Sequence, residues 1–93
     1  MASTDRAHLR IYGRVQGVFF RHQARQRAEA LGLAGWVRNC PDGSVEAVVE
    51  GDQEAVAQFV RWTHRGPPGA HVERVDVERE APEGSTQGFR VTG

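Results

Sequence analysis

A glycine-bearing segment at residues 13–21 has the residue types of an anion-binding loop, and it precedes a predicted helix. The first N–H groups of a helix lack intrahelical acceptors and lie at the positive end of the helix dipole, so they favour an anion. Gly17 allows the backbone to approach a ligand closely, and Arg21 adds a planar guanidinium that matches two phosphate oxygens. A Gly-x-x-x-Arg spacing alone is more typical of a turn and a solvent-exposed arginine, so the interpretation depends on a second element.

Asn39 supplies that second element, because it ends a predicted strand at residues 34–39. A right-handed crossover from the first strand through the helix makes the two strands run in the same direction. Their C-terminal ends then meet at one edge of the sheet, beside the loop at residues 15–21. An amide both donates and accepts hydrogen bonds, which suits holding a water molecule. Position alone favours a turn residue instead, because residues 39–43 are rich in turn formers.

The composition removes several kinds of catalytic site. All twelve basic residues are arginine, which excludes Schiff-base, general-base and P-loop lysines. Cys40 is the only cysteine, which excludes an intrachain disulfide and a four-cysteine zinc site. The histidines at positions 8, 22, 64 and 71 show no metal-ligand spacing within a helix turn, so we expect neither a metal nor a cofactor.

Length and charge favour a single small domain. The 93 residues suffice for one modest core. Twelve acidic residues balance the twelve basic ones, which argues against a general nucleic-acid-binding protein. No apolar run is long enough to cross a membrane, and the first residues lack the apolar stretch of a secretory signal. We therefore expect a cytoplasmic protein, with a monomer as the default.

The spacing of apolar residues predicts two helices and five strands. Residues 1–6 are polar and are expected to be a flexible leader, and residues 7–93 are expected to form one domain. The order of elements is that of an α+β, ferredoxin-like βαββαβ sandwich, with two helices on one face of a mostly antiparallel sheet and a short fifth strand. The strands are expected at residues 8–14, 34–39, 44–50, 72–79 and 89–91, and the helices at residues 21–32 and from Asp52 to the residue before Gly66.

Three local signals refine these boundaries. Asp52 is a good N-cap for the second helix, and Gly32 is a stop signal for the first. Val72 is out of phase with Val75 and Val77, which predicts a bulge at the start of that strand.

Two segments resemble the signatures of the acylphosphatase family. The first resembles its phosphate-binding loop, through Gly13, Val15-Gln16-Gly17-Val18 and Phe20-Arg21. The second is similar to its other signature, through Gly35-Trp36-Val37-Arg38-Asn39, Gly43, Val45 and Gly51. Two linked patterns make the resemblance specific, and weaker matches extend it over nearly the whole chain: Gly66-Pro67-Pro68, Val75, Val77 and Phe89-x-Val91.

The resemblance implies an enzyme, an acylphosphate phosphohydrolase, which converts a small-molecule acyl phosphate to a carboxylate and inorganic phosphate. Arg21 would bind the phosphoryl group, and Asn39 would orient the attacking water. The resemblance further implies phosphate binding by the backbone N–H groups of Gln16, Gly17, Val18, Phe19 and Phe20.

Such a substrate needs no further catalytic group. The leaving carboxylate has a conjugate acid with a pKa of about 4, so it departs without a general acid. Phosphoryl transfer of this kind depends mainly on positioning and on charge stabilisation. His22 is expected at the helix surface and Cys40 lies outside the glycine loop, so neither is expected to be catalytic.

Other functions stay open from the sequence. A non-catalytic phosphate- or ligand-binding regulatory module could share the fold, because a fold does not fix function. An RNA-binding domain of similar topology would need outward aromatic residues and a basic surface, and residues 45–50 lack the aromatic pair. A fragment of a larger maturation enzyme is a third possibility, although the complete set of elements favours a stand-alone enzyme.

Overall fold

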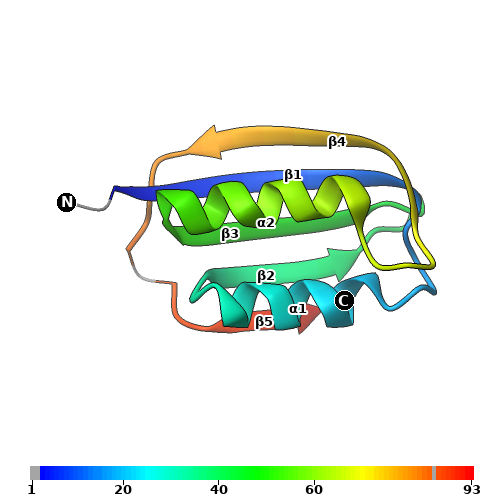
Figure 1. The fold of residues 1–93 in the computed structure, drawn as a ribbon, viewed down its shortest axis with the longest axis horizontal. Coiled ribbons are helices and arrows are strands. Elements are labelled where there is room, and N and C mark those ends of the chain that lie inside the picture. Colours follow the sequence, from blue (N-terminus) through cyan, green and yellow to red (C-terminus); the bar gives the residue numbers. More distant parts are fainter. Residues whose placement is uncertain (1–2, 85) are drawn as a thin grey trace.

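The computed structural model describes residues 3–84 and 86–93, and it has two helices packed on one face of a five-stranded sheet (Figure 1). The predicted ferredoxin-like order is confirmed, and the strand predicted at residues 34–39 has the predicted bounds. The elements in chain order are β1 (Thr4–Arg14), α1 (Phe20–Ala30), β2 (Ala34–Asn39), β3 (Val45–Asp52), α2 (Gln53–Arg65), β4 (His71–Glu80) and β5 (Phe89–Thr92).

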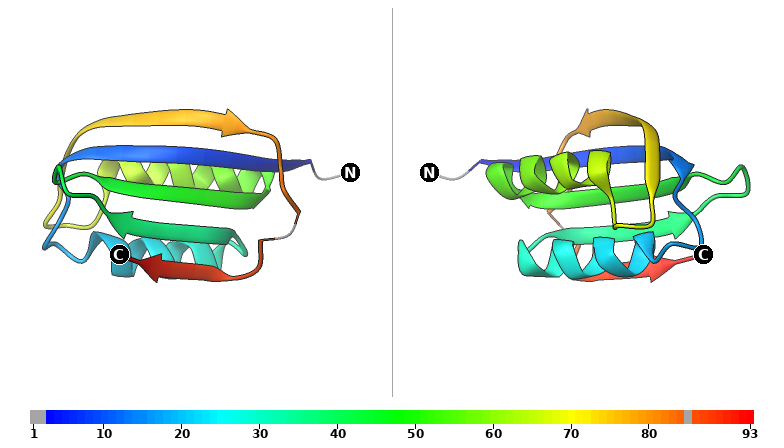
Figure 2. Two further views of the ribbon diagram at one scale, coloured as in Figure 1. Left: turned by 180° about the vertical axis from the view of Figure 1, so that it is seen from behind. Right: turned by 45° about the vertical axis from the view of Figure 1, so that its right-hand side comes forward.

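The sheet has the strand order β4-β1-β3-β2-β5. Strand β3 pairs antiparallel with both β1 and β2, so β1 and β2 run in the same direction and end at the same edge, as the crossover argument predicted. Strand β4 pairs antiparallel with β1, whereas β5 pairs parallel with β2. The sheet is therefore mostly antiparallel, and the left view of Figure 2 shows its open face in front of the helices.

The core lies between the sheet and the helices. In β1, Leu9 and Ile11 are fully buried, whereas His8 and Arg10 lie half-buried on the opposite face. The rings of Phe20 and Trp62 join the two helices, with centroids 5.2 Å apart. The buried residues of the helices are Phe20, Ala24 and Ala28 in α1, and Ala55, Val56, Phe59, Trp62 and Thr63 in α2.

The predicted local signals are confirmed. The Asp52 carboxylate accepts hydrogen bonds from the N–H groups of Glu54 at 3.1 Å and Ala55 at 3.4 Å, which caps α2. Helix α1 ends just before Gly32, which has a φ of 71°. The pairing of β1 with β4 shifts register between Tyr12 and Gly13, opposite the predicted bulge at Val72.

The predicted boundary between a leader at residues 1–6 and a domain from residue 7 is wrong, because β1 begins at Thr4. Thr4, Asp5 and Arg6 continue the ladder with β3, and the Ser3 carbonyl accepts a hydrogen bond from the Gln53 N–H at 2.8 Å. Ion pairs with neighbouring strands neutralise the charges of this segment: Arg6 pairs with Glu50 and Glu80, and Asp5 pairs with Arg79. Residues 1 and 2 lie outside the described residues.

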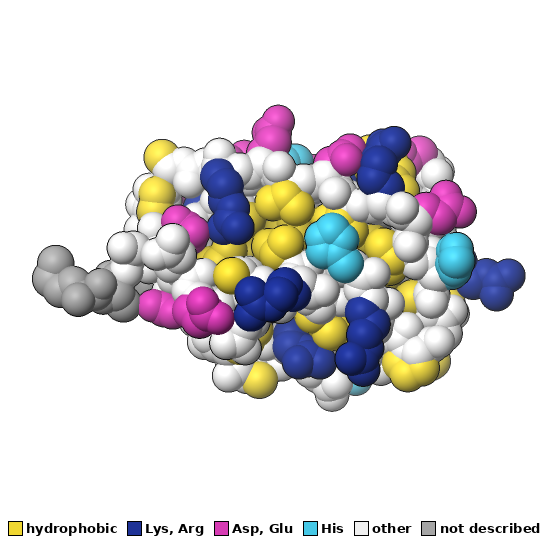
Figure 3. Space-filling view, turned by 45° about the horizontal axis from the view of Figure 1, so that its top comes forward, with side chains coloured by type: hydrophobic (Ala, Val, Ile, Leu, Met, Phe, Trp, Pro, Cys, Tyr) yellow, Lys and Arg dark blue, Asp and Glu magenta, His cyan; other side chains and the backbone are white. Residues whose placement is uncertain are grey.

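Strand β4 lies at one edge of the sheet and is only partly covered by α2. Its residues Val72, Val75 and Val77 are half-buried, and Figure 3 shows hydrophobic side chains at the surface among arginine and histidine side chains on this side. Asp76, Glu78 and Glu80 are exposed. No helix formed by the described residues has the length and apolar character of a membrane span.

Candidate active site

The loop between β1 and α1 spans residues 15–19 and lies at the edge where β1 and β2 end (Figure 1). Gly13 has a φ of 127°, and a Cβ there would lie 2.2 Å from the carbonyl oxygen of His71, so only glycine fits beside β4. Gly17 has a φ of 75°, a conformation that glycine adopts without strain. Val15 is buried in the core, so the loop is fixed at its start.

The side chain of Gln16 attaches the loop to the connection between β2 and β3. Its Nε2 atom donates hydrogen bonds to the carbonyl oxygens of Cys40 at 2.8 Å and Ser44 at 2.9 Å. The sequence predicted only a backbone role for Gln16, because residue spacing does not show which carbonyls a distant side chain meets. The side-chain amide of Gln16 therefore fixes the position of the loop relative to the end of β2.

Phe19 precedes helix α1 in a left-handed conformation, with φ 63° and ψ 24°. It is the one non-glycine residue with positive φ among residues 3–84 and 86–93. Its carbonyl oxygen accepts a hydrogen bond from the Gln23 N–H at 3.0 Å, which starts the helix. The preceding N–H groups of the first turn have no intrahelical acceptor, and they lie at the positive end of the α1 dipole.

Arg21 and Asn39 line one pocket of about 390 Å³ at the start of α1. Residues of α1, of the end of β2 and of strand β5 line this pocket. Arg21 is half-buried, and its Nη1 donates a long hydrogen bond of 3.4 Å to the Gly93 carbonyl oxygen. The lining residues are Val15, Gly17, Phe19, Phe20, Arg21, His22, Arg25, Asn39 and Val91.

Asn39 carries an unsatisfied polar atom. Its amide oxygen Oδ1 is buried and has no hydrogen-bond partner within residues 3–84 and 86–93. A buried acceptor without a partner costs about 1–3 kcal/mol of stability. Such a group is suited to accept a hydrogen bond from a small polar molecule in the pocket that Asn39 lines.

The turn after Asn39 is fixed by a carboxylate. Asp42 accepts hydrogen bonds from the Ser44 hydroxyl at 2.5 Å and the Ser44 N–H at 3.0 Å, and Arg10 donates to it at 3.1 Å. The hydrogen bonds from Ser44, with the charge of Arg10, lower the pKa of Asp42 below its ordinary value. The turn therefore keeps its shape at neutral pH, and with it the position of Asn39.

The pocket lining is basic. It includes Arg21, Arg25 and His22, and none of its described residues is acidic. Arg25 is paired with Glu29 one turn further along α1, at 3.3 Å. Of the two arginines in the lining, Arg21 is therefore the one whose charge is less compensated by a described carboxylate. The helix dipole adds to the same positive field, which favours an anion.

The predicted phosphate-binding residues divide into two groups. Gly17, Phe19, Phe20 and Arg21 line the pocket together with Asn39. Val18 packs toward Gly69 and Gln16 points to the β2–β3 connection, so their side chains do not line it and only their N–H groups could contribute.

Comparisons with known proteins agree with this site. A model of the acylphosphatase family matches residues 7–91. An acylphosphatase from Thermococcus kodakarensis is 60% identical over 88 residues, which is 95% of this chain and 96% of that protein.

The chain belongs to the acylphosphatase family.

Solved acylphosphatase structures have the same fold. The enzyme from Coxiella burnetii is 39% identical with a TM-score of 0.91, over 96% of this chain and 93% of that one. The enzyme from Bacillus subtilis is 32% identical with a TM-score of 0.92, over 96% of this chain and 99% of that one. The prediction of an acylphosphatase, an enzyme that hydrolyses acyl phosphates, is thereby confirmed. The comparisons favour it over a non-catalytic regulatory module.

Two neighbours of the predicted catalytic residues have clear positions in this acylphosphatase. His22 is exposed, as predicted, but it also lines the pocket. Cys40 is buried, and its Sγ lies 3.9 Å from Glu46 Oε1 rather than in the pocket lining. The sequence missed the contribution of Val91 and Arg25 to the pocket, because the parallel pairing of β5 and the turn of α1 bring them there.

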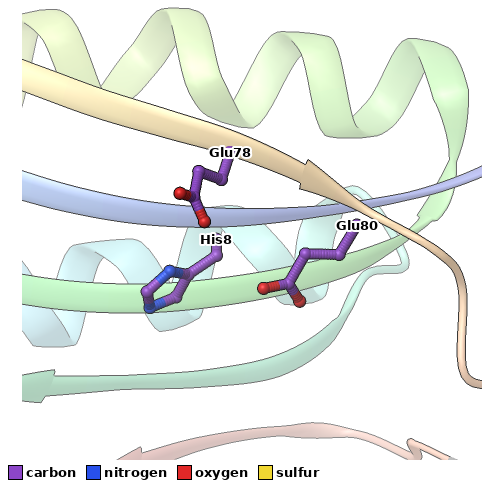
Figure 4. Close-up of side chains that lie close together, drawn as sticks. All are labelled: His8, Glu78 and Glu80. Atoms are coloured by element: carbon purple, nitrogen blue, oxygen red, sulfur yellow. The ribbon is translucent and has the colours of Figure 1, made fainter.

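One group of side chains has metal-ligating types, His8, Glu78 and Glu80, whose ligand atoms lie within 4.8 Å of one another (Figure 4). They lie on the open face of β1 and β4, outside the pocket. His8 Nε2 is 2.6 Å from Glu46, and Glu80 accepts a hydrogen bond from Arg6 at 3.1 Å. Although burial opposes it, the hydrogen bonds from His8 and Arg38 lower the pKa of Glu46. His8 and Glu80 therefore belong to a charge network with Glu46 and Arg6, and the absence of a metal stays a prediction.

Proposed function

We propose that this acylphosphatase binds the phosphoryl group with Arg21 and the N–H groups of residues 16–20, and that Asn39 orients the attacking water. Two observations support the first part: the basic pocket lies at the start of α1, and Arg21 is half-buried in its lining. The single observation that carries the second part is the unsatisfied Oδ1 of Asn39 beside the same pocket.

The reaction follows from these positions. The water oxygen bonds to phosphorus, and the bond between phosphorus and the acyl oxygen breaks. Its electron pair leaves with the carboxylate, and the two protons of the water end on inorganic phosphate. Arg21 and the loop amides stabilise the equatorial phosphoryl oxygens, and Asn39 accepts one hydrogen bond from the water. The carboxylate departs unprotonated because its conjugate acid has a pKa of about 4.

The same chemistry supports a metal-independent reaction. The guanidinium and the helix N-terminus supply positive charge where Mg²⁺ would act in other phosphoryl transfers. We propose that the enzyme needs no metal or cofactor and that it acts as a cytoplasmic monomer that binds no nucleic acid. Light scattering during gel filtration would test the monomer.

The decisive experiment is hydrolysis of benzoyl phosphate with excess chelator. The intact protein is compared with Arg21→Ala, Asn39→Ala and a matched control, Arg65→Ala, which removes an exposed arginine at the end of α2. We expect the two site variants to fold and to lose at least about a hundredfold in kcat/KM, and the control to keep its rate. Full activity of either site variant would contradict the role given to that residue. Activity that disappears with the chelator would contradict metal independence.

A further inference from the structure

The turn between β2 and β3 is held by hydrogen bonds that begin on the open face of the sheet. From β1, Arg10 donates through Nε to the Ser44 hydroxyl at 2.7 Å and through Nη2 to Asp42 at 3.1 Å. Asp42 also accepts from the hydroxyl and the N–H of Ser44, at 2.5 and 3.0 Å. Ser44 is only 2% exposed, so two half-exposed side chains fix a residue that lies inside the fold.

The carbonyl oxygen of Ser44 connects this turn to both parts of the proposed site. It accepts hydrogen bonds from the Cys40 N–H at 2.8 Å and from Gln16 Nε2 at 2.9 Å, which uses both of its lone pairs. Cys40 directly follows Asn39, and Gln16 lies in the loop between β1 and α1. One carbonyl group therefore sets the position of the end of β2 relative to that loop.

The turn is also closed on itself. The Cys40 carbonyl oxygen accepts hydrogen bonds from the Gly43 N–H at 3.1 Å and from Gln16 Nε2 at 2.8 Å. A displacement of Ser44 would therefore move both acceptors of Gln16, and the backbone beside Asn39 with them. A displacement of about 1 Å in a group that orients a reacting molecule can lower the rate about a hundredfold.

Another ion pair on the same face shows what is particular to Arg10 and Asp42. Arg74 and Asp76 are both exposed on β4, 3.2 Å apart. Exposed ion pairs contribute little to the free energy of unfolding, and this pair joins two residues of a single strand. Arg10 and Asp42 instead share the buried Ser44 and join β1 to the turn, so their effect should be on the geometry of the site more than on stability.

We propose that Asp42 and Arg10 are positioning residues for the reaction. They fix Ser44, and through its carbonyl group they set the orientation of Asn39 and the position of the loop at residues 15–19. The inference rests on the proposed function, because it assigns their effect on the rate to Asn39 and to that loop. Neither residue is in the pocket lining, so both act through Ser44 and not on the substrate.

The test measures kcat for benzoyl phosphate and the inhibition constant of inorganic phosphate. Asp42→Ala removes the acceptor of both Ser44 hydrogen bonds, whereas Asp42→Asn keeps a side-chain oxygen that supports the same turn. Asp76→Ala is the matched control, because Asp76 is an exposed aspartate paired with an arginine on the same face. Circular dichroism and urea unfolding establish which variants are folded in the assay.

We expect Asp42→Ala to lower kcat roughly tenfold and to raise the phosphate inhibition constant about threefold, because Asn39 and the loop both lose orientation. Asp42→Asn and Asp76→Ala should keep kcat within about twofold of the wild type. In a Gln16→Ala background, Asp42→Ala should still lower kcat but should no longer change the phosphate inhibition constant. The loop is then already released from the Ser44 carbonyl, so the two substitutions are not additive in phosphate binding.

Arg10→Gln is the second variant, and it decides the test if Asp42→Ala does not fold. It should lower kcat about threefold, whereas the control Arg74→Gln should not. Unchanged kcat in the folded variant, while Asn39→Ala is inactive, would overturn the proposal even if stability falls. Equal losses in Asp42→Ala and Asp42→Asn would also overturn it, because the hydrogen-bond acceptor would not matter. No hydrolysis by the wild type, or full activity of Asn39→Ala, would instead contradict the proposed function.

Discussion

The two ends of the sheet differ in whether their buried polar groups have hydrogen-bond partners. At the end where β1 and β2 finish, Asn39 Oδ1 has no described partner and Phe19 is strained and exposed. At the other end, where β1 begins (Figure 1), the buried carboxylate of Glu50 accepts hydrogen bonds from Arg6 at 3.0 Å, the Glu83 N–H at 2.9 Å and the Gly84 N–H at 2.8 Å. A fully paired group stabilises a fold, whereas an unpaired one beside a pocket is available to a ligand.

The paired end also fixes the chain before β5. The backbone that Glu50 binds belongs to the connection between β4 and β5, the strands at opposite edges of the sheet. Arg6 is 8% exposed and contacts Glu50, Glu80 and Glu83 at 3.0, 3.1 and 3.6 Å. Substitutions at the end with Asn39 should therefore lower activity, whereas substitutions at the end with Glu50 should lower stability.

The largest effect is expected at Arg21. Arg21→Ala should lower kcat/KM for benzoyl phosphate by about a thousandfold, or about 4 kcal/mol of transition-state stabilisation, because the phosphoryl charge loses its main cation. Its free energy of unfolding should change by less than about 0.5 kcal/mol, since the side chain makes one long hydrogen bond. Steady-state kinetics and urea unfolding measure the two quantities. If Arg21→Ala lowers the free energy of unfolding as much as it lowers transition-state stabilisation, the functional contrast between the two ends of the sheet is wrong.

Asn39→Ala should have the next largest effect, again on activity. We expect kcat to fall by about a hundredfold, which is about 2.7 kcal/mol, because the attacking water loses its acceptor. Stability should not fall, since the substitution removes an unsatisfied buried oxygen that costs about 1–3 kcal/mol. A marked drop in the urea midpoint would show that Asn39 supports the fold instead.

Glu50→Gln should have the reverse signature. The loss of a buried carboxylate with three hydrogen bonds should lower the free energy of unfolding by about 2 kcal/mol, while kcat/KM stays within about twofold. Glu54→Gln is the matched control, because Glu54 is exposed on α2 and its pairing with Arg61 should contribute less than about 0.5 kcal/mol. Equal stability of the two variants would contradict a structural role for Glu50.

The effect of Glu50→Gln should depend on pH. The N–H groups of Glu83 and Gly84, and then Arg6, lower the pKa of Glu50 in the folded protein despite its burial. A lowered folded-state pKa gives stability that is complete above the unfolded pKa of about 4.3 and is lost as pH falls through the folded value. The stability difference between wild type and variant should therefore be constant near pH 7 and shrink below about pH 4. Unfolding curves across this range measure it, and a difference that grows on acidification would contradict the assignment.

Gln16→Ala should give the smallest effect, divided between the two properties. Its amide joins the loop to the carbonyls of Cys40 and Ser44, so we expect a loss of about 1 kcal/mol in stability. The loosened loop should also lower kcat/KM about fivefold, because the backbone N–H groups lose part of their orientation. Activity unchanged with reduced stability would show that loop position does not limit the rate.

Most of the fold could be predicted from local sequence. Alternating apolar residues gave the strands, Asp52 and Gly32 marked helix ends, and the out-of-phase Val72 predicted the bulge. The convergence of the loop with Asn39 followed from the handedness of the crossover alone. The extension of β1 to Thr4 was missed, because charged residues on other strands neutralise its charges: Arg79 pairs with Asp5, and Glu50 and Glu80 pair with Arg6.

The finer features of the site depend on contacts that spacing does not show. The hydrogen bonds of Gln16 reach residues 24 and 28 positions away. Val91 enters the pocket lining because β5 pairs parallel with β2, and the left-handed conformation of Phe19 has no composition signal. In the sequence Glu50 is one polar residue in a predicted strand. Its hydrogen bonds to the β4–β5 connection depend on the folded chain bringing residues 83 and 84 beside it.

Titration of inorganic phosphate into isotope-labelled protein, followed by amide NMR shifts, tests the contrast between the two ends most directly. The account predicts that saturable shifts concentrate in the N–H groups of residues 16–21 and the side-chain amide of Asn39, while residues 50 and 83–84 stay unchanged. These shifts should disappear in Arg21→Ala. Shifts centred on Arg6 and Glu50, or none at the loop, would contradict the assignment of the phosphate site.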